Sequence, residues 1–293
     1  MGTPRQRHRV PGCSRVAVVG HRSEPAGYAE WVPSPPLRRY IARVWTSGRV
    51  PTSGPVPSVP QASEPVLPDG CIDIIWNGVR LFVAGPDTVP NWADAGGPFA
   101  VGLRFRPGMA PLFLNTPARE ILDQRLDLEL FWTEAGAIGE ELADCPNLLR
   151  AASVLERRVA SLLGGIREPD PAVEAAAVLW AAGGDTAPTA ELARRAGVSE
   201  RQLHRRFLPA VGYGPKLLQR VLRLQAFLSA CRDPRPSLAE LAARVGYADQ
   251  AHLNREARAL AALTPARLRA SRTEVRIVQD AGSPGQLQPP DDT

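Results

Sequence analysis

A segment near the C-terminus occurs twice, and this repeat constrains the fold more than any other feature of the chain. The first copy reads AELARRAGVSERQLHRRF, residues 190–207, and the second reads AELAARVGYADQAHLNREA, residues 239–257. The first residues match at an offset of 49, and after one extra residue in the second copy the match continues at an offset of 50, as far as Pro215 and Pro265. Two units of one supersecondary structure are therefore expected.

Each copy carries the parts of a helix-turn-helix, in which two short helices meet at a tight turn. Thr189 and Ser237 are suitable caps for the first helices, and Ser199 is suitable for the second helix of the first copy. A glycine after each first helix can end it with a left-handed backbone: Gly197 and Gly246. Between the copies, apolar residues at helical spacing without Gly or Pro predict one connecting helix over residues 216–232.

The basic charge of the chain is concentrated in the same region. Residues 181–272 hold 16 Arg and Lys against 7 Asp and Glu, a net charge of +9, whereas the rest of the chain holds 19 against 23, a net charge of −4. Such an uneven distribution is the electrostatic pattern of a domain that binds nucleic acid.

The second helix of each copy is predicted to turn polar side chains outward, because apolar residues four positions apart face inward. The outward residues of the first copy are Arg201, His204, Arg205 and Leu208, and those of the second are Gln250, Ala251, Asn254, Arg255 and Arg258. In the major groove an arginine can pair with guanine, and Gln or Asn with adenine. Arginines beside these helices suit phosphate contacts: Arg194, Arg206 and Arg244.

Over about residues 185–270 the chain resembles the DNA-binding domain of AraC/XylS-type transcription regulators, which has two such units joined by a helix. The resemblance is carried by GVSERQLHRRF at 197–207 and GYADQAHLNREARALAALTPARLR at 246–269. The resemblance implies a sequence-specific DNA-binding transcription regulator. It places the base-reading positions at Arg201, His204, Arg205, Gln250, Asn254 and Arg255. The sequence departs from the family pattern at Ala257, where an aromatic residue is usual, and at Ala262, where glycine is common. Both departures are consistent with a second unit that packs less tightly or reads DNA less strictly.

The N-terminal half has short apolar runs at 40–45, 71–76, 81–84 and 99–105, which predict a small β-rich domain. Within it LPDGCIDIIW (67–76), VAGP (83–86) and VGLRFRPGMAPLFL (101–114) resemble the sensory domain of one AraC-type subgroup, which implies a regulatory module without naming a ligand. Helical patterns follow at 118–130, 134–142, 148–163 and 172–180.

These patterns predict an α+β chain. An N-terminal β-rich sensory domain precedes an all-α C-terminal domain with two helix-turn-helix units joined by a long helix. The expected parts are a disordered extension (1–27), the β-rich domain (28–116), a helical connector (117–182), the double helix-turn-helix domain (183–272) and a disordered tail (273–293). The apolar surface of the connector can pair two chains or dock the two domains, and the sequence leaves both open.

Two other classes of function compete with the regulator. Cys71, beside Asp69 and Asp73, is the one candidate nucleophile for an enzyme or repair protein that uses the repeat for targeting. The nearest histidine in sequence is His21 and the run alternates like a strand, so no catalytic residue is predicted. The other class is an architectural protein that binds DNA without sequence preference.

Composition narrows the expected ligands and partners. The four cysteines lie far apart without a C-x-x-C pair, so neither a disulfide framework nor a metal site is predicted, and no cofactor is expected. No stretch approaches the roughly 20 apolar residues of a membrane helix, which predicts a cytoplasmic protein without a membrane partner.

Double-stranded DNA is the expected partner. A small-molecule effector, a homodimer and, for an activator, RNA polymerase stay open. Five aromatic residues can line an effector pocket, although a place in the core is favoured: Trp45, Trp76, Phe82, Trp92 and Phe105.

Overall fold

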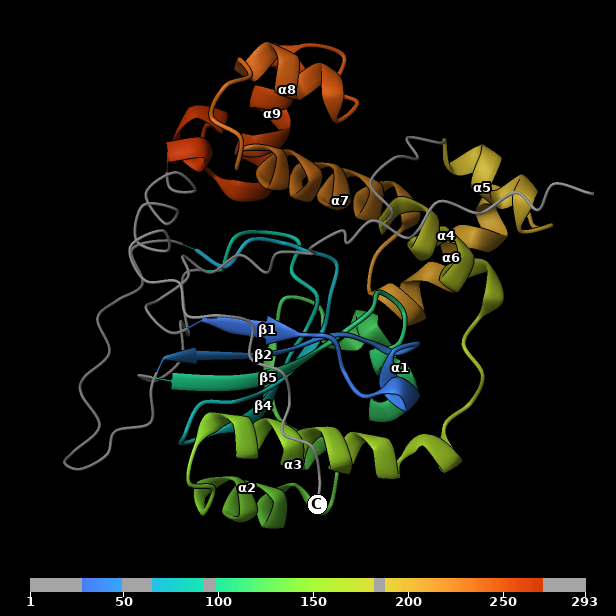
Figure 1. Cartoon of the computed structure of the whole chain (residues 1–293). Coiled ribbons are helices and arrows are strands. Elements are labelled where there is room, and N and C mark those ends of the chain that lie inside the picture. The colour runs from blue at the N-terminus through green and yellow to red at the C-terminus, as the bar shows by residue number, and fades with distance from the viewer. Residues whose placement is uncertain (1–27, 49–64, 92–98, 182–187, 271–293) are drawn as a thin grey trace, which may run out of the picture.

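A computed structural model describes residues 28–48, 65–91, 99–181 and 188–270. The disordered segments expected at 1–27 and 273–293 lie outside these residues, as does Trp92. An antiparallel sheet with its own helices is followed by a domain built only of helices, as Figure 1 shows, and the predicted fold class is confirmed.

Within the described residues the sheet has six antiparallel strands in the order β1-β2-β5-β3-β4-β6. The strands are β1 (Ala29–Trp31), β2 (Ile41–Gly48), β3 (Asp73–Trp76), β4 (Leu81–Ala84), β5 (Phe99–Phe105) and β6 (Arg125–Asp127). The four apolar runs that predicted strands correspond to β2, β3, β4 and β5. A short 3₁₀ helix, Pro35–Leu37, leads into β2.

The two faces of the sheet differ in chemistry because successive side chains of a strand point to opposite sides. One face packs its apolar side chains, such as Ile74 and Leu103, against the helices α1 (Ala110–Leu114), α2 (Ala135–Ala143) and α3 (Leu148–Ser161). The opposite face carries Trp45, Asp73 and Arg104, all buried although two of them are charged. This second face is the one that lines a cavity.

The helix predicted over 118–130 is wrong. The chain instead forms a 3₁₀ helix (Ala118–Glu120), strand β6 and a second 3₁₀ helix (Leu128–Leu130). Pairing of β6 with β4 supplies the backbone partners, and Arg125 donates to both carboxylate oxygens of Asp87 at 3.0 and 2.6 Å. The sheet therefore continues past residue 116.

The other helices expected in the connector are present. Each packs apolar side chains within the chain, while Leu149 of α3 and Val178 of α4 are exposed. Helix α3 contacts β2 and β5, and a 3₁₀ turn follows it at Leu163–Gly165. Helix α4 (Pro171–Ala181) places Val173 and Ala176 in the core of the first helix-turn-helix unit. Arg39, between the 3₁₀ helix and β2, donates to both carboxylate oxygens of Glu174 in α4 at 3.0 Å. Helix α4 therefore docks the helical domain on the sheet domain.

The helical domain contains α5 (Thr189–Arg195), α6 (Glu200–Val211), α7 (Pro215–Ala230), α8 (Leu238–Arg244) and α9 (Gln250–Ala261). The α5–α6 and α8–α9 units lie near opposite ends of α7, which passes beside the sheet domain (Figure 1). The predicted connecting helix is thus confirmed. None of the helices that the structure describes is long and apolar enough to span a bilayer.

Candidate nucleic-acid interface

Local hydrogen bonds start the helices of both units. Ser199 accepts from the backbone N–H of Gln202 at 3.2 Å, and the Gln202 side chain accepts from the backbone N–H of Ser199 at 2.8 Å. Ser237 and Glu240 form the same reciprocal capping box at the start of α8. The expected cap at Thr189 is wrong, because Thr189 is the first residue of α5 and is buried. The extended backbone of Pro188 stands at the cap position instead.

The turns and cores of the two units repeat as the sequence predicts. Gly197 has a φ of +66° and Gly246 a φ of +83°, the left-handed backbone that glycine adopts most readily. The inward residues Leu203 and Phe207 are fully buried in the first unit. Ala257, in the place of an aromatic residue, is also fully buried in the second unit. Phe227 and Tyr247 supply aromatic side chains to that core.

The face of α6 that the sequence predicts to read bases is open to solvent. Arg201, His204 and Arg205 are exposed. In the described part of the chain, neither arginine forms a hydrogen bond or an ion pair. The His204 ring lies against Gly214 at the start of α7, so close that a Cβ on Gly214 would fall 2.6 Å from Nε2. His204 therefore also takes part in the packing between α6 and α7.

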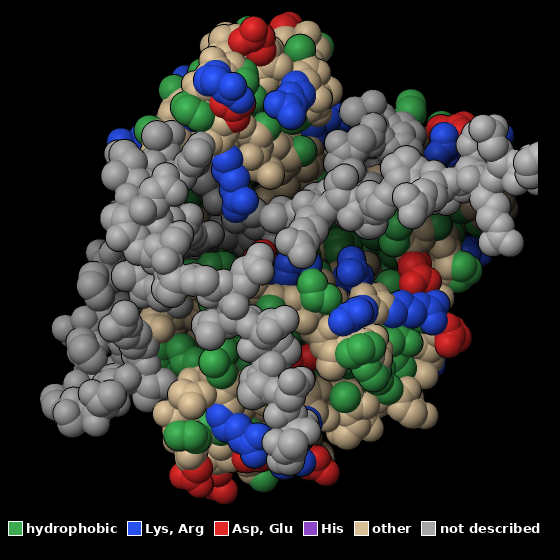
Figure 2. Space-filling model, in the orientation of Figure 1, with side chains coloured by type: hydrophobic (Ala, Val, Ile, Leu, Met, Phe, Trp, Pro, Cys, Tyr) green, Lys and Arg blue, Asp and Glu red, His purple; other side chains and the backbone are tan. Residues whose placement is uncertain are grey.

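The face of α9 that the sequence predicts to read bases is likewise polar and largely open to solvent. Gln250 and Arg255 are exposed and Asn254 is half-buried, and none of the three side chains has a hydrogen bond within the described ranges. His252 differs, because its Nδ1 accepts from the backbone N–H of Ala248 at 3.3 Å and its ring meets Tyr247 edge-on. Figure 2 shows several Lys and Arg side chains on the visible face of the lobe that holds α8 and α9.

The three arginines expected to contact phosphate have different surroundings. Arg194 donates to both carboxylate oxygens of Glu191 at 2.8 and 2.7 Å, and these bonds, with one from Arg195, lower the pKa of Glu191 to about 2. Arg206 lies 3.5 Å from Asp170. Arg244 is exposed and has no hydrogen bond or ion pair among the residues described. Arg244 is thus the most available of the three.

Two basic residues beside the first reading face were not predicted. Lys216 and Arg220, in the first turns of α7, line an open groove together with Arg201. Arg220 also donates to Glu256 of α9 at 2.8 Å. The signal in the sequence is the position of Lys216 directly after Pro215, a residue that favours the first turn of a helix.

The comparisons with known proteins give one family match in the sheet domain and another in the helical domain. Residues 192–271 match a family model described as a helix-turn-helix domain, and residues 29–127 match the model of a domain of unknown function (DUF6597). The C-terminal domain is an AraC-type helix-turn-helix domain. Such a domain supports a DNA-binding transcription regulator.

Two solved structures are distantly similar to this chain. An apo lysine-to-alanine variant of ToxT from Vibrio cholerae has 10% sequence identity and a TM-score of 0.39, and the match covers 69% of this chain and 86% of that one. ToxT from Vibrio cholerae bound to an unsaturated fatty acid has 9% identity and a TM-score of 0.38, with 70% and 84% covered. No curated protein matches the chain.

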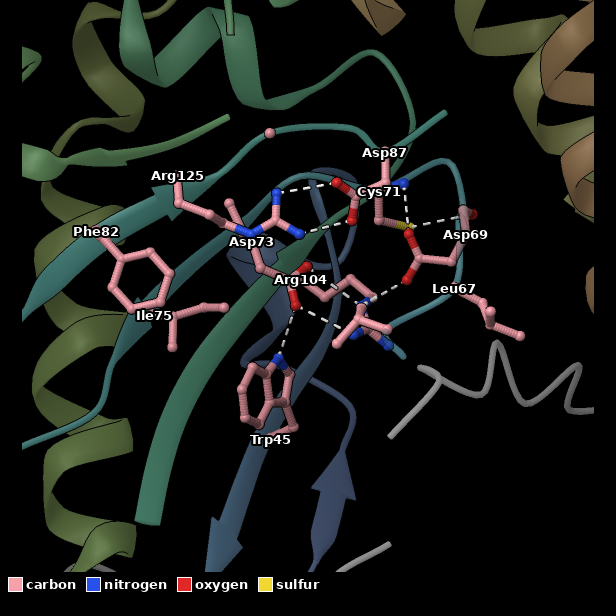
Figure 3. Close-up of a pocket in the computed structure, with 13 residues that line it drawn as sticks. Trp45, Leu67, Asp69, Cys71, Asp73, Ile75, Phe82, Asp87, Arg104 and Arg125 are labelled. Carbon is pink, nitrogen blue, oxygen red and sulfur yellow. Dashed lines mark hydrogen bonds and ion pairs between the residues drawn. The ribbon is translucent and has the colours of Figure 1, made fainter. Parts of the chain in front are cut away.

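A network of buried charges lies in the sheet domain, on the side toward the AraC-type domain, and sequence reasoning missed it. Asp73 accepts from Nε1 of Trp45 at 3.0 Å and from Nε and Nη2 of Arg104 at 3.2 and 3.1 Å (Figure 3). A second pair joins Asp87 to Arg125 beside it, and burial raises the pKa of Asp87 to about 6. The available signal was a charged residue inside an apolar run, Asp73 within 71–76 and Arg104 within 99–105.

The aromatic residues of the sheet domain divide between core and cavity. Trp76 and Phe105 are buried in the core with the helices of the sheet domain, as favoured. Trp45 and Phe82 line the cavity that holds the charged network.

Cys71 has the surroundings of an inert thiol. It is buried, and its Sγ lies 3.8 Å from the carbonyl oxygen of Asp69. Burial and the neighbouring Asp69 carboxyl raise the pKa of the thiol well above its ordinary value, which opposes the thiolate that a nucleophile needs. Within the described ranges, no group of three His, Cys, Asp or Glu residues could hold a metal ion.

Proposed function

We propose that the protein is a sequence-specific transcription regulator whose AraC-type domain reads two elements of one DNA duplex. The observation that carries this proposal is a pair of exposed arginines at matching positions of α6 and α9, Arg205 and Arg255, which have no hydrogen-bond partner among the residues that the structure describes. Helix α7 has 16 residues and is therefore about 24 Å long. A rigid connector of this length suits reading helices that enter successive major grooves on one face of DNA.

The side chains divide into two roles. Arg201, Arg205 and Arg255 have the donor geometry for guanine, and Gln250 and Asn254 have the amide groups for adenine. Arg194, Arg206 and Arg244 contact phosphates, which position the protein without reading the sequence. His204 supports the α6–α7 packing as well as facing the DNA.

Regulation enters through the sheet domain, which we propose binds a small-molecule effector. Its buried cavity shares the segment 65–71 with the surface that meets α7, so a ligand there can favour one arrangement of the reading helices over another. The protein acts in the cytoplasm, where its promoter DNA lies.

The two competing functions make different predictions. An enzyme that uses Cys71 needs a reactive thiol, and the burial of Cys71 opposes this. An architectural protein needs no base-reading side chains, so random competitor DNA should compete for it as well as any selected site.

The test is a selection of bound sequences from random duplex DNA with the full chain at fixed, near-physiological salt, because affinity depends steeply on salt. We expect an enriched motif with two elements about one helical turn apart. The matched control is the double variant Arg205→Ala, Arg255→Ala, which should enrich no such motif while it still binds DNA weakly. Recovery of random sequence by the wild type, with and without the candidate effector described below, would contradict the proposal.

A further inference from the structure

The cavity in the sheet domain is small and has one apolar side. Its volume is about 40 Å³, enough for on the order of three or four non-hydrogen atoms. Trp45, Ile75 and Phe82 form the apolar side, and the charged residues of the network form the other, as Figure 3 shows. A small molecule with both a polar and an apolar part fits these walls.

Arg104, which lines this cavity, has one buried donor atom that is unsatisfied within the described residues. Arg104 uses Nε and Nη2 for Asp73, and Nε also lies 3.4 Å from Asp69. Its Nη1 is buried without a hydrogen-bond partner among the residues that the structure describes. An unsatisfied buried donor on a charged group is costly, so the site favours an occupant with an acceptor oxygen.

More acidic than basic side chains line the cavity. The carboxyl groups of Asp69, Asp73 and Asp87 stand against the guanidinium groups of Arg104 and Arg125. Asp73 and Asp87 each accept two hydrogen bonds from an arginine, whereas Asp69 accepts one from the backbone N–H of Cys71 at 2.9 Å. Asp69 is therefore the carboxyl group with the most unused acceptor capacity. Burial raises the pKa of Asp69, and a cation beside it would favour the ionised carboxylate.

We propose that this cavity binds a small organic ammonium ion that also carries a hydroxyl or carbonyl oxygen. The ammonium group donates to Asp69, the oxygen accepts from Nη1 of Arg104, and the carbon atoms lie against Ile75 and Phe82. This inference rests on the proposed function, because it gives the effector of the regulator a chemical class.

The segment 65–71 connects the cavity with the AraC-type domain. Asp69 lines the cavity, while the next residue, Gly70, packs so closely on α7 that a Cβ there would fall 2.6 Å from Cδ1 of Leu218. The carbonyl of Pro68 accepts from the side chain of Gln225, also in α7, at 2.5 Å. Leu67 joins the core formed by α7, α8 and α9. A ligand that moves Asp69 therefore acts on the helix that separates the two reading helices.

The test measures the thermal unfolding midpoint of the full chain with ethanolamine, whose amine is protonated at neutral pH. At about 20 mM ethanolamine we expect the midpoint to rise by about 3 °C or more. Ethylammonium, which lacks the oxygen, and ethylene glycol, which lacks the charge, should raise it by less than half as much, and sodium or potassium chloride of equal ionic strength should not raise it. No rise with ethanolamine, or an equal rise with any of these controls, would overturn the proposal.

A pair of variants places the effect at Asp69. Asp69→Asn keeps the shape and the acceptor for Cys71, and it should lose the response to ethanolamine. Asp127→Asn removes an exposed carboxylate at the edge of the same sheet and should keep the response. A full thermal response to ethanolamine in Asp69→Asn would overturn the assignment of the ammonium site to Asp69. The comparison of additives on the wild type remains valid even if that variant is less stable.

DNA binding separates this inference from the proposed function. Ethanolamine should change the affinity of the wild type for its selected DNA at least threefold and leave that of Asp69→Asn unchanged. A selected motif without any thermal response to ethanolamine refutes the ligand class but keeps the regulator. A thermal response in a protein that selects no motif, with or without ethanolamine, refutes the regulator but keeps the ligand site.

Discussion

Arg205 and Arg255 occupy the same place in the two units: each stands two residues after a fully buried leucine, Leu203 or Leu253, and each is exposed. Because each guanidinium can form two hydrogen bonds with guanine, we expect Arg205→Ala or Arg255→Ala to weaken binding to the preferred DNA by about 1–3 kcal/mol. Specificity should relax at one base position of the matching element. Titration of labelled duplexes at fixed salt measures both effects.

Arg244→Ala and Arg157→Ala are the controls for this prediction. Loss of a phosphate contact at Arg244 should weaken preferred and random DNA alike and reduce the salt dependence of binding. Arg157, an exposed arginine of α3, pairs with Glu141 and lies outside the AraC-type domain, so its loss should leave DNA binding unchanged. Equal losses on preferred and random DNA for Arg205→Ala would contradict its base-reading role.

The AraC-type domain could be predicted from sequence because its signals are local and occur twice. The signals of one unit lie within a short stretch of sequence: a serine cap, apolar residues four positions apart and a glycine at the turn. In the second unit Ser237, Leu241 and Gly246 all take the predicted places. The prediction failed at Thr189, where the helix begins one residue earlier than expected and the cap position falls on Pro188.

The cavity and strand β6 could not be predicted, because their partners are distant in sequence. Arg125 stands 38 residues from Asp87, and Arg104 stands 31 residues from Asp73. The apolar spacing of 118–130 suits a helix equally well, and only the pairing of Arg125–Asp127 with β4 decides for a strand. Burial of charge on the second face of the sheet likewise depends on the segment 65–71, which covers it.

Ala262 ends α9 with a φ of +55°, a backbone that is strained for alanine and relaxed for glycine. We therefore expect Ala262→Gly to stabilise the AraC-type domain by about 1 kcal/mol, since the side chain is exposed and no packing is lost. Chemical denaturation of the full chain, followed by helical circular dichroism, measures the change.

Ala259→Gly is the matched control in the same helix. Ala259 is also exposed but has ordinary helical backbone, so glycine there should destabilise the domain by about 0.5–1 kcal/mol. We expect Ala262→Gly to raise the stability and Ala259→Gly to lower it. A loss of stability in both variants would show that Ala262 is not strained.

Gly102 allows the Trp45 indole to lie flat on β5. A Cβ on Gly102 would fall 2.4 Å from Cζ2 of the indole, and Trp45 is only 2% exposed. Gly102→Ala should therefore displace the ring from Asp73 and destabilise the sheet domain by about 1–3 kcal/mol. The indole N–H signal of Trp45 in a nitrogen–proton NMR spectrum should move, because its hydrogen bond to Asp73 is broken.

Gly139→Ala is the control for this crowding. Gly139 lies in α2, and a Cβ there would meet nothing within 4 Å. Alanine in place of glycine in a helix should add about 0.5–1 kcal/mol of stability and leave the Trp45 signal in place. An unchanged Trp45 signal in Gly102→Ala would show that the added methyl group is accommodated without displacing the indole, and would contradict this prediction.

Cys71 should resist alkylation in the folded protein because its thiol is buried and its pKa is raised by that burial. Treatment with iodoacetamide at mildly alkaline pH, followed by mass spectrometry, should leave Cys71 and the buried Cys231 unmodified while the half-buried Cys145 reacts earlier. Denatured protein should be alkylated at both Cys71 and Cys231, which controls for the chemistry. Cys71→Ser should retain the selected DNA motif. Rapid alkylation of Cys71 together with loss of function in Cys71→Ser would instead favour an enzyme that uses this thiol as its nucleophile.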